Sequence, residues 1–239
     1  MPRNIGRSGL TGNEQPREKI AVVTITVANL FAGTRHSLFM GPARQWIAFA
    51  LALGLGAAGD AFAGDIPLSP AEAQRVAARG IVIKATLDAS QRRGTIRAAI
   101  RIDAPAHVVF QMMTRCEDAM QYVPHMRLCR VRDQAPDNTW QLVEHEIDFG
   151  WYAPRIKYVF RADLVADRRI DFRQVTGDFK ANQGSWVLEP ADDGSHTLLL
   201  YRAYIDPPGY MPNWLVRSTF RREMPQMLTD LRKRCEATH

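Results

Sequence analysis

The sequence lacks the short motifs that are typical of metal-binding sites, nucleotide-binding sites and serine hydrolases. It has three cysteines but no C-x-x-C pair, and none of its six histidines are paired at the spacing of metal ligands on a helix. It also has no G-x-S-x-G elbow and no P-loop. We therefore expect no bound metal and no cofactor.

Neither positive nor negative charge is concentrated in a single stretch of the sequence. The formal net charge is +6, but residues 1–63 hold six of the 31 Lys and Arg and three of the 25 Asp and Glu, which leaves +3 for residues 64–239. The arginines of residues 64–239 are scattered along the expected strands and the last helix, as on solvent-exposed faces. They do not cluster on one element that could contact nucleic-acid bases. We expect no nucleic-acid partner.

No apolar run reaches the ~20 residues that cross a bilayer comfortably, yet a shorter run has the layout of an export signal. The segment RQWIAFALALGLGAAGDAFAGD begins at Arg44 and combines a positive charge, an apolar stretch and the small-x-small pattern Ala61-Phe62-Ala63. These are the three parts of a secretory signal peptide. We expect cleavage after Ala63 and a periplasmic or otherwise exported protein. The alternative is that the uncleaved apolar segment anchors the chain.

The position of this signal, more than forty residues into the chain, sets the expected domain organisation. A start at Met40 would put the signal at the true N-terminus. Residues 1–39 are then a mis-called or disordered extension, and residues 40–63 are the signal peptide. An N-terminal segment with a short helix follows at 64–80, where Ser69 has the sequence of a capping box with Glu72. Residues 81–236 form one domain, a length that suits a single core.

Hydrophobic periodicity in that domain predicts strands at both ends of two short helices. Alternating residues predict a hairpin over 81–102, and Pro105 begins the first of the helices. Further alternating stretches predict strands at about 127–133, 140–152, 155–165, 170–176, 184–189 and 196–206. A helix follows from about Asn213. Its apolar stripe consists of Val216, Phe220, Met224, Met227 and Leu231, and Pro225 is expected to kink it.

This order predicts an α+β fold in which a strongly curved antiparallel sheet wraps around the long C-terminal helix. It resembles the helix-grip fold of the START-like (SRPBCC) superfamily, and within it the polyketide cyclase/dehydrase and coenzyme Q-binding group. The likeness rests on IRIDAPAHVVFQMMTRCEDAMQYVPHM from Ile100, GSWVLEP from Gly184, LLLYRAYIDPP from Leu198 and FRREMPQMLTDLRKRCE from Phe220. It implies a cavity between sheet and helix, although one such fold hosts many functions.

The predicted inward faces supply the candidate ligand-binding residues. His145 stands out because a polar side chain on an apolar strand face needs a partner or a ligand. The full set is His145, Ile147, Phe149, Trp151, Tyr158, Phe160, Phe172, Trp186, Tyr201, Phe220, Met224 and Met227. The same residues are also what a solid core would contain, so the sequence leaves both interpretations open.

Three functions follow from these residues. The first is binding of a hydrophobic small molecule, such as a lipid, an isoprenoid or a quinone-like compound. The second is a cyclase or dehydratase that uses His145 as acid and base. The third is an interaction module with a filled core, which contacts a partner or a membrane surface through the basic face of the last helix. Export favours the first function, because cyclase substrates are usually made inside the cell.

The cysteines bear on the compartment. An exported chain meets oxidising conditions, in which Cys116 and Cys129 are near enough in sequence to form a disulfide. Whether they do depends on a Cα–Cα distance that the sequence does not give.

Overall fold

The computed structural model describes residues 66–90, 92–151 and 153–238. The expected extension at 1–39, the signal peptide at 40–63 and its cleavage site lie outside the described residues. Within the described part of the chain, no helix combines the length and the apolar character needed to cross a membrane.

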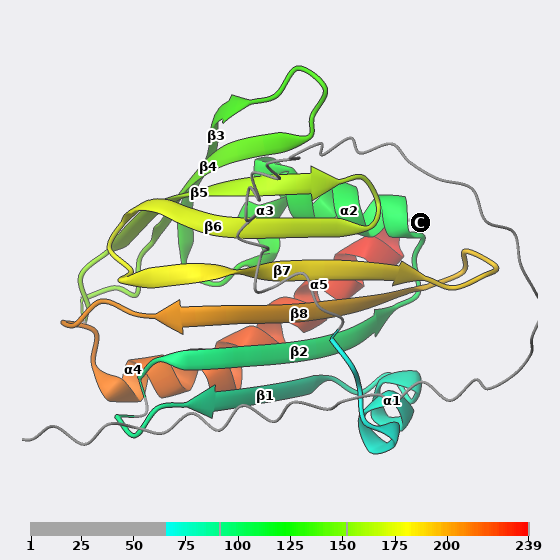
Figure 1. Cartoon of the computed structure of the whole chain (residues 1–239), viewed down its shortest axis with the longest axis horizontal. Coiled ribbons are helices and arrows are strands. Elements are labelled where there is room, and N and C mark those ends of the chain that lie inside the picture. The colour runs from blue at the N-terminus through cyan, green and yellow to red at the C-terminus, as the bar shows by residue number, and fades with distance from the viewer. Residues whose placement is uncertain (1–65, 91, 152, 239) are drawn as a thin grey trace, which may run out of the picture. The chain divides into compact units, whose positions relative to one another are not determined.

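A single eight-stranded antiparallel sheet forms most of the fold (Figure 1). Its order is β1-β2-β8-β7-β6-β5-β4-β3, so the first hairpin lies beside the last strand. The strands are β1 (Val82–Leu87), β2 (Gly94–Ile102), β3 (Met126–Gln134), β4 (Trp140–Ile147), β5 (Ile156–Val165), β6 (Arg169–Gly177), β7 (Ala181–Pro190) and β8 (Thr197–Asp206). Each expected strand is present, with its ends shifted by a few residues.

The helices lie where the period changes in the sequence. They are α1 (Pro70–Ala77), α2 (Ala106–Thr114), α3 (Cys116–Tyr122), α4 (Asn213–Ser218) and α5 (Met224–Thr238), with a π-helical turn, η1 (Thr219–Glu223), between the last two. Figure 1 shows α5 running behind β7, β8 and β2. The expected helix-grip fold, a curved sheet with a long C-terminal helix and short helices between early strands, is confirmed.

The two faces of the sheet are covered by different helices because residues alternate along each strand. On the inner face, Ile96, Ile100 and Leu199 pack in one cluster with Leu228 and Leu231 of α5. On the outer face, α1 covers a smaller cluster that contains Val76, Val82, Ala99 and Leu200. The strand β2 is therefore buried on both sides, whereas the strands β3 to β6 bury apolar side chains on the inner face alone.

The sequence predicts that Pro225 kinks the last helix, and the structure shows a different effect of this residue. Proline has no N–H to donate to the carbonyl one turn earlier. The helix continues through it, and the turn just before it, η1, is π-helical. Such turns are rare and are frequent at functional sites. This one places Thr219, Phe220 and Glu223 along the inner cavity.

The strand expected over 140–152 ends early, and one candidate residue is consequently wrong. β4 stops at Ile147, which pairs with Ile156, and Gly150 then adopts a φ of +87° in the loop to β5. Alternation cannot be extended past the last paired residue. Phe149 is still buried, but Trp151 is 96% exposed and does not face inward.

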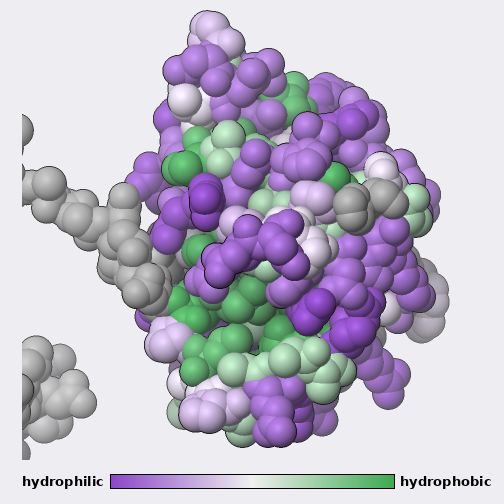
Figure 2. All heavy atoms as spheres, turned by 90° about the vertical axis from the view of Figure 1, so that its right-hand side faces the viewer, coloured by the Kyte–Doolittle hydropathy of each residue, from purple (hydrophilic) through white to green (hydrophobic). Residues whose placement is uncertain are grey.

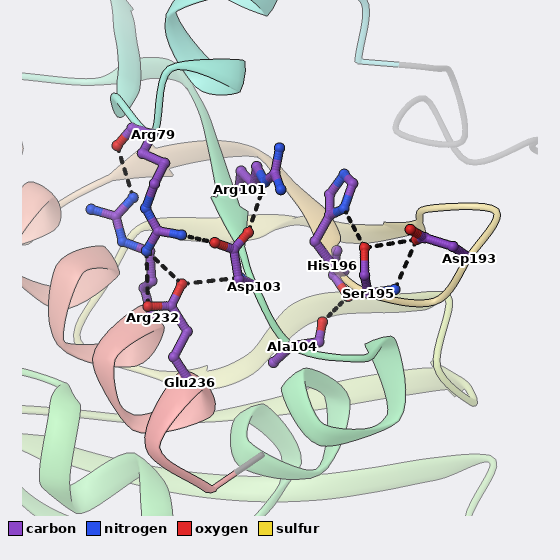
Figure 3. A network of polar contacts seen from close by, with 10 residues as sticks. Arg79, Arg101, Asp103, Ala104, Asp193, Ser195, His196, Arg232 and Glu236 are labelled. Carbon is purple, nitrogen blue, oxygen red and sulfur yellow. Dashed lines mark hydrogen bonds and ion pairs between the residues drawn. The ribbon is translucent and has the colours of Figure 1, made fainter.

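A polar network ties the C-terminal helix to the end of β2 (Figure 3). Arg79 pairs with Asp103 and donates to Glu236 Oε1 at 2.8 Å, while the Asp103 backbone N–H donates to the same oxygen at 3.0 Å. Arg232 donates to the Arg79 carbonyl at 2.9 Å. These contacts fix the last turns of α5 against the end of β2. The end of the molecule drawn in Figure 2 is mostly hydrophilic, with a smaller apolar area near its centre.

Candidate functional site

A cavity of about 340 Å³ lies between the sheet, the short helices and the C-terminal helix. Eleven of the twelve candidate ligand-binding residues line it, all except Trp151: His145, Ile147, Phe149, Tyr158, Phe160, Phe172, Trp186, Tyr201, Phe220, Met224 and Met227. Ligand pockets are typically apolar in this way, with a few polar groups that orient the ligand. The structure thus brings the predicted inward faces together around a space and does not fill it with side chains.

Aromatic rings form much of the sheet side of the cavity. Phe172 and Tyr201 are stacked with ring centroids 6.2 Å apart, and Trp186 lies 4.2 Å from Tyr201. Phe160 contacts Phe172 edge to face at 6.3 Å. These rings come from β5, β6, β7 and β8, so they hold one another in place across four strands. Rings packed in this manner give a wall of fixed shape.

His145 of β4 faces this cavity and lies between polar partners on the two neighbouring strands. Its Nδ1 is 3.0 Å from the Tyr158 hydroxyl on β5, and its Nε2 is 3.3 Å from the Cys129 Sγ on β3. A disulfide sulfur has no hydrogen to give and accepts only weakly. We therefore assign the imidazole proton to Nε2, which points at the sulfur. The Tyr158 hydroxyl then donates a hydrogen bond to Nδ1.

Burial keeps this imidazole neutral. Desolvation lowers the pKa of His145 from its ordinary value of 6.5 to about 4. Burial likewise raises the pKa of the Tyr158 hydroxyl above its ordinary value, so both groups are uncharged at neutral pH. The neighbouring carboxylates are directed elsewhere: Glu144 accepts from Arg132 at 2.8 Å, and Glu146 pairs with Lys157 at 3.1 Å.

The lowered pKa predicts how stability depends on pH. The unfolded chain binds a proton at His145 near pH 6.5, whereas the folded protein does so only near pH 4. Acid therefore favours the unfolded state, and the free energy of unfolding falls as the pH drops from about 6.5 to about 4. The full loss is on the order of 3 kcal/mol. The amide of His145→Gln does not titrate. Over the same pH interval, the free energy of unfolding of this variant should therefore fall by about 3 kcal/mol less than that of the native protein.

Urea unfolding of both proteins at pH 7 and pH 4 measures this difference directly. Other groups also titrate in this range, so only the difference between the two proteins counts. Equal losses of stability in the two proteins would contradict a buried neutral His145.

A disulfide forms part of the cavity wall. The structure joins Cys116 at the start of α3 to Cys129 on β3, and their Cα atoms are 5.1 Å apart. Both residues line the cavity. The bond fastens α3, which contributes Ala119 and Tyr122 to the lining, to the strand beside His145. Cys235 is buried in α5 and has no disulfide partner.

Sequence reasoning missed a second polar group in the cavity. Glu223 of η1 lines it, and its Oε1 lies 3.9 Å from Nε2 of His125. Burial raises the pKa of the Glu223 carboxyl above its ordinary value. The signal was available, because Phe220, Glu223 and Met227 have the three-and-four spacing of one helix face. The remaining polar lining residues include Thr114, Arg115, Gln141, Asn182 and Thr219 and the tyrosines Tyr122 and Tyr201.

Two other arrangements do not form sites. In the turn before β8, Asp193 accepts from the Ser195 hydroxyl at 2.7 Å and does not orient His196, so the order of a catalytic triad is absent (Figure 3). In the described residues, no group of three His, Cys, Asp or Glu side chains is placed to hold a metal ion.

Comparison with known proteins agrees with the geometry. The model of the family described as polyketide cyclase / dehydrase and lipid transport matches residues 102–232, which is more than half of the chain. No curated protein matches the sequence.

Solved structures share the fold at low sequence identity. A STAR-related lipid transfer protein from Xanthomonas axonopodis is 18% identical with a TM-score of 0.55, over 65% of this chain and 93% of that one. A START superfamily protein from Mycobacterium smegmatis is 14% identical with a TM-score of 0.52, over 61% of this chain and 99% of that one. With the family model matched from β2 to α5, this chain belongs to the polyketide cyclase/dehydrase and lipid transport family.

Proposed function

We propose that this protein is an exported carrier that binds a hydrophobic small molecule, such as a lipid, an isoprenoid or a quinone-like compound. The observation that carries the proposal is the apolar cavity of about 340 Å³ under the curved sheet. Transfer of apolar area from water into such a cavity contributes about 25 cal/mol per Å². The family description covers both transport and enzymatic roles, so the choice between them rests on the site.

The site supports a carrier better than an acid/base enzyme. A general base works best with a pKa near the working pH, whereas burial lowers the pKa of His145 to about 4. Its two contacts are a tyrosine hydroxyl and a disulfide sulfur, so no carboxylate is available to stabilise an imidazolium. A neutral pair of this kind orients a ligand without moving a proton.

Two features support export. The segment from Arg44 to Asp65 has the composition of a signal peptide. The pairing of Cys116 with Cys129 suits an oxidising compartment, because disulfides persist there and are rare in the cytosol.

The first test is native mass spectrometry of the protein purified from the exported fraction, followed by organic extraction. We expect a bound apolar molecule in near-stoichiometric amount. A His145→Ala variant that still binds this molecule but loses a turnover seen in the native protein would favour the enzyme.

An empty protein, still empty after incubation with total membrane lipid, would contradict the carrier. Salt-sensitive binding of that empty protein to anionic vesicles would favour the interaction module instead. Arg217, Arg221 and Arg222 are exposed beside Trp214, which is 51% exposed, and this surface would supply the contact.

A further inference from the structure

Among the polar groups that line the cavity, two on different elements are hydrogen-bond acceptors. The first is the Tyr158 hydroxyl oxygen. Its hydrogen is directed to Nδ1 of His145, because Nε2 carries its proton toward the disulfide sulfur. The oxygen lone pairs of Tyr158 remain for a ligand.

The second acceptor is the carboxylate of Glu223. It is placed along the cavity by the π-helical turn η1, and its side chain is only 19% exposed. His125 lies 3.9 Å away at one oxygen, beyond a direct hydrogen bond, so the carboxylate keeps capacity to accept. The Thr219 hydroxyl, one turn earlier, lies 3.1 Å from the Leu215 carbonyl and also interacts with the Glu223 carboxylate, where it opposes the rise in pKa that burial causes. A carboxylate has about four lone-pair sites, so capacity for a ligand hydroxyl remains.

The positive charge near this site is already paired. Arg115 also lines the cavity, but 62% of its side chain is exposed and its Nε lies 3.4 Å from the Asp118 carboxylate. Among the described lining residues, Arg115 is the only Lys or Arg and Glu223 is the only Asp or Glu. A carboxylate or phosphate inside the cavity would therefore approach Glu223 without a free cation to compensate it.

We propose that the cavity selects an apolar alcohol or phenol, whose hydroxyl donates to Glu223 or to Tyr158, and that Glu223 rejects ligands with an anionic head. This inference rests on the proposed carrier function and deepens it by naming the ligand class. It separates hydroxyl-bearing lipids and reduced, phenolic quinols from ionised fatty acids and oxidised quinones, which offer only acceptors or negative charge.

The test compares three molecules with the same ten-carbon chain: 1-decanol, decanoate and 1-methoxydecane. Each competes with the neutral dye N-phenyl-1-naphthylamine for the full chain at pH 8, which keeps carboxyls ionised. The alcohol should bind at least about tenfold more tightly than the acid because of charge repulsion. It should also bind about tenfold more tightly than the ether, which has no hydrogen to donate.

Glu223→Gln isolates the carboxylate. The amide still accepts a hydrogen bond but carries no charge, so the ratio of alcohol to acid affinity should fall to within about threefold. The matched control is Glu189→Gln, which removes the same charge from an exposed position on β7, away from the cavity lining, and should leave the ratio unchanged.

Three results would overturn the inference: equal binding of ether and alcohol, tighter binding of the acid, or an unchanged ratio in folded Glu223→Gln. The ether comparison uses the unmodified protein, so it decides the question even if the variant does not fold. A folded protein that binds neither the dye nor any of the three molecules would refute the carrier function itself, which is a different outcome from binding without selectivity.

Discussion

Ala162→Trp is expected to weaken binding of the hydrophobic ligand strongly while leaving the protein folded. Ala162 lies on β5, opposite Gln141 of β4 and Phe172 of β6, and its side chain is 4% exposed. It lines the cavity. An indole added there must enter the space that the ligand would occupy, and we expect the affinity to fall by at least about tenfold.

The same substitution should be mild for stability because the cavity gives the new ring room. Inserting a large side chain into a filled core typically costs about 1–3 kcal/mol or more, so a cost near the lower end is expected here. Dye titration and urea unfolding measure the two effects separately.

Val159→Trp is the matched control for this experiment. Val159 lies on the same strand, outside the cavity lining, so its replacement should preserve binding. Full affinity in folded Ala162→Trp would mean that the ligand binds somewhere else.

Removal of the disulfide is expected to have the largest effect on stability. The bond closes a loop with a sequence separation of 13 residues, and bonds of this size stabilise by about 3 kcal/mol by constraining the unfolded chain. The double variant Cys116→Ala/Cys129→Ala should therefore unfold at a clearly lower urea concentration. It should also bind ligand more weakly, because α3 is no longer fastened to β3 beside His145.

A reductant supplies the control within the same experiment. Dithiothreitol should lower the stability of the native protein to about that of the double variant, and it should leave the variant unchanged. A native protein that responds to the reductant no more than the variant does would show that the bond does not hold the fold.

The sequence by itself determined the element order and the fold. Two patterns depend on backbone geometry alone: the strict alternation in strands such as Ile96 to Ile102, and the apolar stripe from Val216 to Leu231. Both can therefore be recognised without knowledge of any long-range contact. For the same reason, eleven of the twelve inward residues are found around the cavity. Trp151 was wrong because the loop after Ile147 ends the period.

Only the tertiary structure decided how these residues meet. The contact of His145 with Tyr158 and Cys129 depends on the register of β3, β4 and β5, which no local pattern specifies. Helical spacing could place Glu223 on the apolar face of the last helix, but the π-helical turn that contains it, where periodicity predicts a regular helix, appears only in the structure. Whether the inner residues enclose a space or fill it is a matter of volume and side-chain packing across the sheet, and such packing exists only once distant segments are brought together.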